Sequence, residues 1–215
     1  MAWYVFAVVD APPPKPGRGL SGPLAVRRID GGFAVVERRA DVPPFDFGTL
    51  QAHERIVERL AALVPAILPV RFGTLLSSSD LETSFVERRE ELREAFDRVR
   101  GRVQFTWRSA GAEPVARARA QAARTRSGTD YLRRAARAAH PPAPSSFRRV
   151  RRLANLAAEE RFAEATTIVP AALYHLVDRV RAGAYASAAA DVRTHAPGLT
   201  WSGPFAPYAF APELL

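Results

Sequence analysis

Cysteine is absent from the sequence of 215 residues. Structural disulfides, catalysis by a thiolate, and zinc or iron–sulfur sites ligated by cysteine are therefore excluded within this chain. Lysine is almost absent as well, because Lys15 is the only one and nearly all basic residues are arginine. Since alanine is also abundant, we attribute the preference for arginine to genomic base composition rather than to chemistry.

Long apolar runs are also missing. The longest lies around residues 61–70, contains two prolines and is flanked by Arg59 and Arg71. A helix that spans a membrane needs about 20 apolar residues, so none is predicted. The N-terminal MAWYVFAVVD lacks the basic segment that begins a signal peptide and turns acidic at Asp10. We therefore expect an intracellular protein.

The sequence motifs of common enzyme classes are missing too. There is no GxxxxGK[ST] or GxGxxG phosphate-binding loop and no GxSxG nucleophile turn. His53-Glu54 begins like the zinc-protease motif HExxH, but Val57 stands where the second histidine would be. We expect His53 to be a hydrogen-bonded structural residue. No catalytic residue, metal site or cofactor is predicted.

The first half of the sequence alternates between strand and helix patterns. Aromatic and β-branched residues predict a buried strand at the N-terminus, and Asp30-Gly31-Gly32 is a hairpin signal between two short apolar runs. The predicted strands are Trp3–Val9, Leu24–Ile29, Phe33–Glu37 and Ile67–Val70. The predicted helices are Thr49–Leu63 and Asp80–Arg100, the second with a capping box of Ser79 and Glu82.

The second half is rich in alanine and arginine, and the composition changes near Gly101. Alternation predicts a half-buried strand at Val103–Trp107, and a half-buried His175 in a later strand. Further strands are predicted at Ala172–Val177 and Leu199–Ser202, and helices at 129–139, Ser145–Ala165 and Gly183–His195. We predict an α+β protein with two domains, residues 1–100 and 101–215.

The net charge of +9 comes from one segment. Between Arg117 and Arg152 there are eleven arginines and one acidic residue, Asp130. Such a segment can bind nucleic acid, contact an acidic protein surface or remain solvated. Tyr131 and Phe147 are its only aromatic residues, which is few for base stacking, so nucleic acid is not the expected partner. An arginine-rich binder of nucleic acid or anions stays the alternative function, and a small enzyme the third.

Three segments of the sequence are more specific than these patterns. They are HER at 53–55 followed by ILPVRFGT at 67–74, then GTDYL at 128–132, then LTWSGPFAPYAF at 199–210. In this order and spacing they resemble the GvpF/GvpL family of gas vesicle proteins, and the resemblance covers nearly the whole chain. The motif residues, which are also the candidates for an interaction, are His53, Glu54, Pro69, Arg71, Phe72, Gly73, Tyr131, Gly203, Pro204, Phe205, Pro207, Tyr208 and Phe210.

The resemblance implies a cytoplasmic protein that is associated with gas vesicles, as an accessory or minor structural component. Such proteins act in vesicle nucleation and assembly. The implied partners are the small hydrophobic shell protein GvpA and other accessory proteins, with no cofactor and no membrane. The implied fold has two α+β domains, the second of them ferredoxin-like, and this agrees with the order of predicted elements.

The residues add three structural expectations. The strand that ends near Pro69 is a docking edge for a partner or an ordinary protected sheet edge. Arg71 is expected to pair with Glu54 as a structural clamp. The aromatic and proline-rich run at 203–210 is expected to pack on the protein, either bridging the two domains or on the second domain alone.

Overall fold

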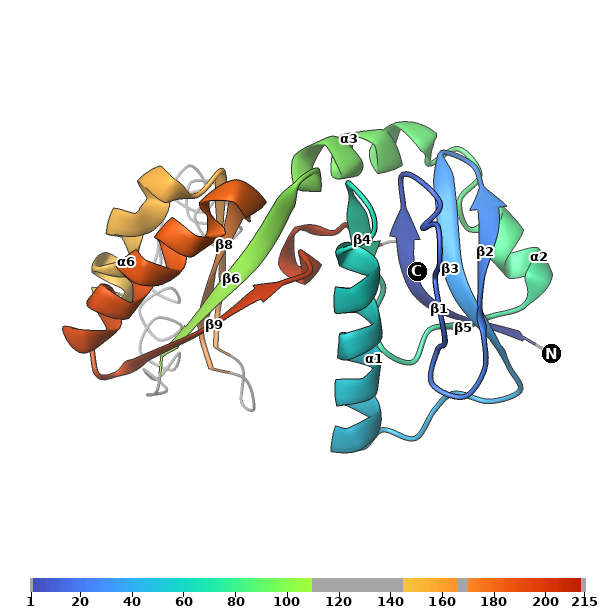
Figure 1. Cartoon of the computed structure of the whole chain (residues 1–215), viewed down its shortest axis with the longest axis horizontal. Coiled ribbons are helices and arrows are strands. Elements are labelled where there is room, and N and C mark those ends of the chain that lie inside the picture. The colour runs from blue at the N-terminus through green and yellow to red at the C-terminus, as the bar shows by residue number, and fades with distance from the viewer. Residues whose placement is uncertain (1, 110–144, 166–169, 214–215) are drawn as a thin grey trace, which may run out of the picture. The chain divides into compact units, whose positions relative to one another are not determined.

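The computed structural model describes residues 2–109, 145–165 and 170–213, and these form two compact units (Figure 1). The first unit contains residues 2–104 together with 205–213, and the second contains the described residues from 105 to 204. The chain enters the second unit close to the expected boundary at Gly101. It then returns to the first unit at Phe205, whereas the sequence analysis placed everything after residue 101 in the second domain.

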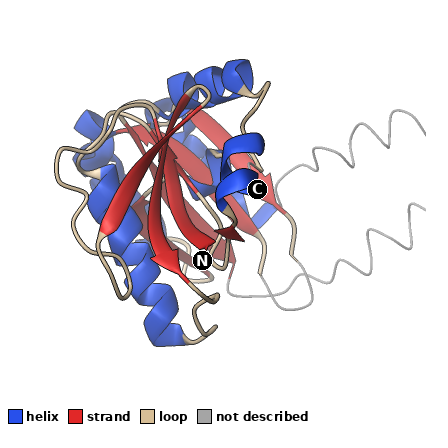
Figure 2. Cartoon of the chain, turned by 90° about the vertical axis from the view of Figure 1, so that its right-hand side faces the viewer, coloured by secondary structure: helices blue, strands red, loops and turns tan. Residues whose placement is uncertain are grey.

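The first unit is an antiparallel sheet covered by helices (Figure 2). Its strands are β1 (Ala2–Val9), β2 (Leu24–Ile29), β3 (Gly32–Arg39), β4 (Ile67–Pro69) and β5 (Leu75–Leu76). Their order is β2-β3-β1-β4, and β5 pairs with the other end of β1. The helices are α1 (Phe47–Ala61), α2 (Ser78–Thr83) and α3 (Arg89–Val99). The hairpin of β2 and β3 is confirmed.

Both faces of β1 are buried, since no residue from Tyr4 to Val9 is exposed. On one face Tyr4 and Phe6 pack in a cluster with the apolar side of α1, which includes Val57 and Leu60. On the opposite face, α2 contacts β1 and α3 contacts β4. A strand buried on both faces explains why the sequence of β1 is apolar throughout rather than alternating.

Side-chain caps set the first residues of α1 and α2. Asp46 accepts hydrogen bonds from the Thr49 backbone N–H at 2.8 Å and from its hydroxyl at 2.9 Å. Ser77 accepts one from the Asp80 N–H at 3.1 Å. Both caps satisfy N–H groups that have no partner inside the helix. The predicted cap at Ser79 is therefore wrong, because the helix begins earlier.

The predicted helix Asp80–Arg100 is divided in two. α2 ends at Thr83, α3 begins at Arg89, and between them Glu87 has a φ angle of 66°, which is incompatible with a right-handed helix. Phe85 lies in this break and is completely buried. The periodicity of the sequence therefore identified the buried side chains of this region but not the change in direction between α2 and α3.

One buried carboxylate holds the long Pro/Gly segment between β1 and β2. Glu37 of β3 accepts hydrogen bonds of 2.5–2.8 Å from three backbone N–H groups, those of Leu20, Ser21 and Gly22. The Ser21 hydroxyl donates another at 2.7 Å, and Arg39 lies 3.7 Å from the same carboxylate. Burial alone would raise the pKa of Glu37, but the hydrogen bonds outweigh burial and hold the pKa below its ordinary value.

The second unit contains a sheet of four strands in the order β7-β8-β6-β9. The strands are β6 (Arg102–Ser109), β7 (Glu159–Ala163), β8 (Ala172–Asp178) and β9 (Leu199–Phe205). The helical elements are α6 (Ala182–Thr194) and the 3₁₀ helices η1 (Ser145–Arg148), η2 (Val150–Leu156) and η3 (Arg179–Arg181). β8 lies between β6 and β7, as a split βαβ arrangement requires. The ferredoxin-like assignment of this unit stays a prediction.

The predicted helix Ser145–Ala165 is wrong. Phe147, Val150 and Leu153 are buried, and their spacing of three residues suits the 3₁₀ helices η1 and η2. The chain then extends and forms β7, which pairs with β8 in antiparallel register. The strand was missed because alanines give its surroundings a helical composition. The predicted helix at 129–139 lies outside the described residues.

Burial in the second sheet exceeds the sequence prediction. Phe105 and Trp107 are buried on one face of β6, but Gln104 and Thr106 on the other face are buried too, so the strand is not half-buried. His175 is likewise completely buried. Polar residues at these positions suggested a solvent-facing side, whereas their hydrogen bonds allow them to lie inside. Within the described residues, no helix is both long and apolar enough to span a membrane.

Candidate functional site

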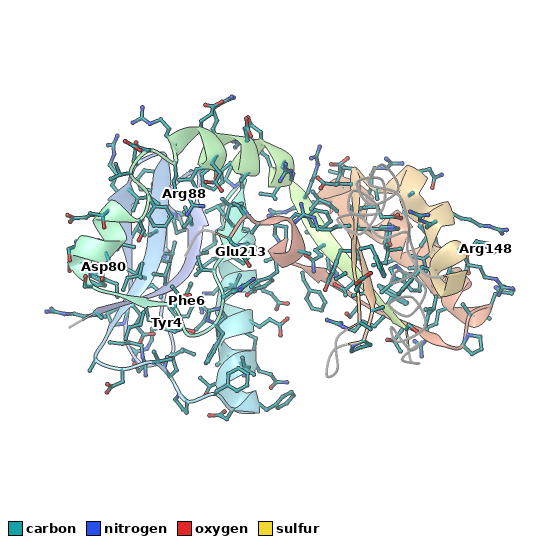
Figure 3. All side chains as sticks on the ribbon, turned by 180° about the vertical axis from the view of Figure 1, so that it is seen from behind. Tyr4, Phe6, Asp80, Arg88, Arg148 and Glu213 are labelled. Carbon is teal, nitrogen blue, oxygen red and sulfur yellow. The ribbon has the colours of Figure 1, made fainter. Side chains whose placement is uncertain are left out.

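Motif residues from three distant parts of the sequence meet in the first unit. His53 comes from α1, Phe72 and Gly73 from the turn after β4, and Tyr208 from the C-terminal tail. Tyr4 of β1, labelled in Figure 3, belongs to the apolar cluster against which Phe72 and Tyr208 pack. Its ring is edge-on to those of His53 and Phe72, with centroids 5.7 and 6.1 Å away.

A chain of hydrogen bonds joins the turn to the helix. The Gly73 N–H donates to the Tyr4 hydroxyl at 3.2 Å, and the Tyr4 hydroxyl lies 3.0 Å from Nδ1 of His53. Because the Tyr4 hydroxyl accepts from Gly73, its own proton is available for Nδ1 of His53. Gly73 has a φ of 94°, a conformation that favours glycine. Gly73, Tyr4 and His53 are therefore joined by hydrogen bonds, and we call these three residues the buried clamp.

His53 is neutral in this clamp. Burial lowers the pKa of His53 to about 4, and the backbone of Val70 only partly opposes this. The side chain is 3% exposed, which confirms the prediction of a hydrogen-bonded structural histidine. The imidazole is buried and hydrogen-bonded to Tyr4, so it contributes to the packing of this region.

The low pKa of His53 predicts that stability falls when the pH is lowered from 7 to 5. An unfolded histidine takes up a proton near its ordinary pKa of 6.5 and the folded one only near 4. Below pH 6.5, protonation of His53 therefore lowers the free energy of unfolding, by about 2 kcal/mol at pH 5. Burial also lowers the pKa of His175, despite Glu160 beside it, so both histidines act in the same direction. Urea unfolding at the two pH values measures the loss.

The variant His53→Gln serves as the comparison for this pH dependence. It should be less stable than the natural chain at pH 7 but should lose less stability between pH 7 and pH 5. The carboxylate of Glu37 does not interfere, because its folded pKa lies below 4.5 and its contribution is lost only under more acidic conditions. Equal pH dependence in the two proteins would contradict the assignment of a buried neutral His53.

Pro69, Arg71 and Tyr208 line one small cavity of about 80 Å³, together with residues of the tail. At its mouth Arg71 pairs with Glu213, and both side chains are exposed. The predicted pair of Arg71 with Glu54 is therefore wrong: the arginine points to the tail instead of to α1. An exposed ion pair contributes little to stability, so Arg71 is not the clamp that the sequence suggested.

The tail packs on the first unit. Phe210 is completely buried, Ala206 belongs to the same apolar cluster as α1, and the Ala209 N–H donates to the Gln104 side chain at 2.7 Å. Burial raises the pKa of Tyr208, and the charges of Glu54 and Glu58 on α1 raise it further, which places its hydroxyl near that helix. The expectation that the run 203–210 packs on the protein is therefore confirmed, but packing on the second domain alone is wrong, because the residues from 205 onward belong to the first unit.

The remaining motif residues do not join this cluster. Gly203 and Pro204 lie in β9 within the second unit, and Tyr131 lies outside the described residues. The strand that ends at Pro69 is the edge of its sheet, as predicted, but all of its residues are buried. The buried strand offers no exposed surface to a partner. Of the two alternatives, a docking edge or an ordinary protected edge, the burial favours the protected edge.

An exposed apolar surface lies directly beside the clamp, and the sequence analysis did not single it out. Phe45 is 82% exposed and Val42 is 50% exposed in the segment that leads into α1, and Phe47, the first residue of α1, is 75% exposed. The Phe45 ring lies 5.9 Å from that of Phe72, centroid to centroid. We call Val42, Phe45, Phe47 and Phe72 the aromatic patch. The signal in the sequence is the pair of phenylalanines in the run DVPPFDF at 41–47, because a large apolar patch at the surface is more informative than a single exposed apolar residue.

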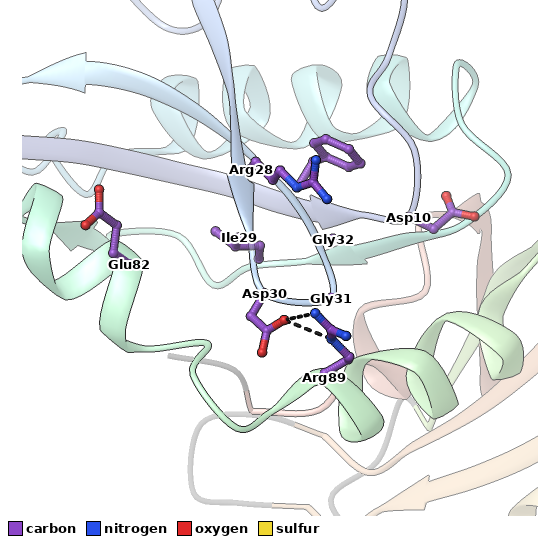
Figure 4. A pocket seen from close by; sticks show the side chains of 9 residues that line it. Asp10, Arg28, Ile29, Asp30, Gly31, Gly32, Glu82 and Arg89 are labelled. Atoms are coloured by element: carbon purple, nitrogen blue, oxygen red, sulfur yellow. Dashed lines mark hydrogen bonds and ion pairs between the residues drawn. The ribbon is translucent and has the colours of Figure 1, made fainter.

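A second hollow lies at the tip of the hairpin of β2 and β3 (Figure 4). This depression of about 660 Å³ carries charges of both signs. Most of them are already paired: Arg89 binds Asp30 at 2.7 Å, and Asp10 pairs with Arg100. Gly31 at the tip has a φ of 86° and packs against the backbone of Arg89. These contacts hold the tip of the hairpin against α3. The paired charges do not form an arrangement suited to catalysis.

The second unit contains a buried chain of polar groups. The Trp107 indole donates to the Tyr185 hydroxyl at 2.9 Å, and that hydroxyl lies 2.6 Å from Nδ1 of His175. Nε2 of His175 lies 3.0 Å from Glu160, which pairs with Arg151 at the surface. Burial raises the pKa of Tyr185 and lowers that of His175. Because every member has its partners, the chain specifies the packing of this sheet rather than a reaction.

Charge and possible metal ligands add no further site within the part of the chain that the structure describes. Of the eleven arginines in the basic segment, only Arg148, Arg149, Arg151 and Arg152 are described there, and Arg148 points outward (Figure 3). No group of histidine and acidic side chains among the described residues could hold a metal ion. The aromatic patch is therefore the best candidate for contact with another molecule.

Comparison with known proteins gives a consistent result. A family model described as gas vesicle synthesis protein GvpL/GvpF matches residues 2–212. Among curated proteins, none matches the sequence. The fold is similar to two crystal structures of the gas vesicle protein GvpF. The one from Anabaena sp. PCC7120 has 17% sequence identity and a TM-score of 0.69, covering 98% of this chain and 96% of that one. The one from Microcystis aeruginosa has 15% identity and a TM-score of 0.70, covering 98% and 99%.

Proposed function

The chain belongs to the GvpL/GvpF family of gas vesicle synthesis proteins, and from this premise we propose that it acts in the nucleation and assembly of gas vesicles. In this proposal it is a cytoplasmic accessory or minor structural protein that is associated with the vesicle. It binds the hydrophobic shell protein GvpA and other accessory proteins. It has no catalytic activity and needs no cofactor.

A physical argument supports this role. The wall of a gas vesicle needs an inner face that repels water, so a shell subunit exposes apolar surface before it is assembled. Exposed apolar surface leads to aggregation unless something covers it. An accessory protein with an apolar surface of its own can bind the unassembled subunit and limit wrong association.

The observation that carries the proposal is the aromatic patch on a rigid first unit. Phe45 and Phe47 are exposed, yet the segment that bears them is fixed at Asp46, which caps α1, and at Phe72, which contacts the buried clamp. Large aromatic side chains held in place are the residues that contribute most to protein interfaces. The buried polar chain of the second unit, by contrast, has its partners within the protein.

Deletion of the gene in its host tests the function. The deletion strain should form few or malformed gas vesicles, while its growth in shaken culture remains unchanged. Electron microscopy and the loss of turbidity under pressure measure the vesicles, and expression of the natural chain from a plasmid should restore them. Normal vesicles in a deletion strain that carries no second copy of the gene would refute the assembly role.

A further inference from the structure

The aromatic patch draws its members from three neighbouring parts of the first unit. Val42 and Phe45 come from the segment before α1, Phe47 is the first residue of α1, and Phe72 comes from the turn after β4, where it contacts Phe45. A Cβ atom placed on Gly73 of that turn would lie 3.8 Å from Val42, so Val42 lies over the same turn. The exposed Phe45 ring therefore lies on Phe72, which itself contacts Tyr4 and His53.

The clamp makes the patch rigid. Phe72 contacts the rings of both Tyr4 and His53, with centroids 6.1 and 5.5 Å away. The Asp46 carboxylate holds the chain between the two exposed rings by its bonds to Thr49. A surface that is already ordered loses little conformational entropy when it binds a partner. Because Phe45 and Phe47 remain largely exposed in the folded chain, their position suits contact with another molecule.

The area of the patch decides between partners. Two phenylalanine rings exposed to this degree present about 300 Å² of apolar surface, which is near the largest patch of an ordinary monomer. A stable dimer buries about 800 Å² on each partner. The patch is therefore too small to hold a second copy of this chain by itself, but it is large enough to hold a short apolar segment for a limited time.

We propose that the aromatic patch binds a short apolar segment of the unassembled shell protein, an inference that rests on the function proposed above. Phe45 and Phe47 supply most of the contact area, and Val42 and Phe72 complete the surface beneath them. Such a contact is weak and exchanges readily, as an assembly factor requires, because the segment must be released when the subunit joins the wall.

Binding can be measured on the full chain with labelled peptides. Fluorescent peptides of 15 residues that together cover the host's shell protein serve as probes, and fluorescence anisotropy reports their affinity. At least one apolar peptide should bind the natural chain. The double variant Phe45→Ser/Phe47→Ser should bind it at least about tenfold more weakly, because both rings then leave the interface.

A matched control removes apolar side chains that are exposed elsewhere. Val86 is 57% exposed and Val180 is 95% exposed, and neither belongs to the aromatic patch. The variant Val86→Ser/Val180→Ser should bind the peptide as the natural chain does. Both double variants should unfold near the temperature at which the natural chain unfolds. If Phe45→Ser/Phe47→Ser, the patch variant, does not fold, Phe45→Ser alone replaces it, because that substitution leaves α1 untouched.

Four results would overturn the inference. One is that the patch variant binds the peptides as tightly as the natural chain does. Another is that no peptide of the shell protein binds the natural chain. Sedimentation could instead reveal a dimer that the patch variant abolishes, which would make a second copy the occupant. In the deletion strain, full rescue by the patch variant would refute the inference and leave the proposed function intact, whereas normal vesicles without any copy would refute the function itself.

Discussion

A chain that ends after Pro204 should lose most of the stability of its first unit. The truncation removes Ala206, which lies in the core beside α1, and Phe210, which is completely buried. It also leaves the Gln104 side chain without the N–H of Ala209 that it accepts. Phe210→Ala alone should cost about 3–5 kcal/mol, because a buried ring is replaced by a cavity.

The thermal midpoint gives the magnitude. Each kcal/mol corresponds to about 2–4 °C in a chain of this size, so Phe210→Ala should lower the midpoint by about 6–20 °C, and the truncation should lower it further. A chain that ends after Phe210 is the control. It loses the exposed pair of Arg71 and Glu213 but keeps the buried ring, so its midpoint should change little. A truncation after Pro204 that leaves the midpoint unchanged would mean that the tail is free in solution.

Replacing Glu37 with alanine should release the long loop between β1 and β2. Four hydrogen bonds to the carboxylate are lost, three of them from backbone N–H groups. Because bonds to a charged group contribute more than neutral ones, we expect a loss of about 3 kcal/mol. The variant Glu37→Gln, which keeps one oxygen acceptor, should lose less than Glu37→Ala.

Limited proteolysis detects the release of this loop directly. Arg18 lies in the loop, and trypsin should cleave after it much faster in Glu37→Ala than in the natural chain. The control is Glu90→Ala, since Glu90 pairs with Arg93 on the exposed side of α3 and its loss should change stability by less than about 1 kcal/mol. Equal cleavage of all three proteins would contradict the role of Glu37.

The order of elements in the first unit could be predicted because its signals are local. The apolar run of β1, the Asp-Gly-Gly turn and the periodicity of α1 each lie within a few residues of one another. The two errors in helix prediction have a different origin. The break at Glu87 and the strand β7 arise where packing against a sheet overrides a helical composition.

The sequence by itself determined the α+β class, the edge position of the strand that ends at Pro69, the structural role of His53 and the family. Each follows from residue types and spacings that neighbouring positions supply. Only the tertiary structure decided that Arg71 pairs with Glu213, that the tail returns to the first unit, and that Phe45 and Phe72 adjoin on one surface. These contacts join residues far apart in the chain, and an isolated sequence contains no signal for which distant residues will meet.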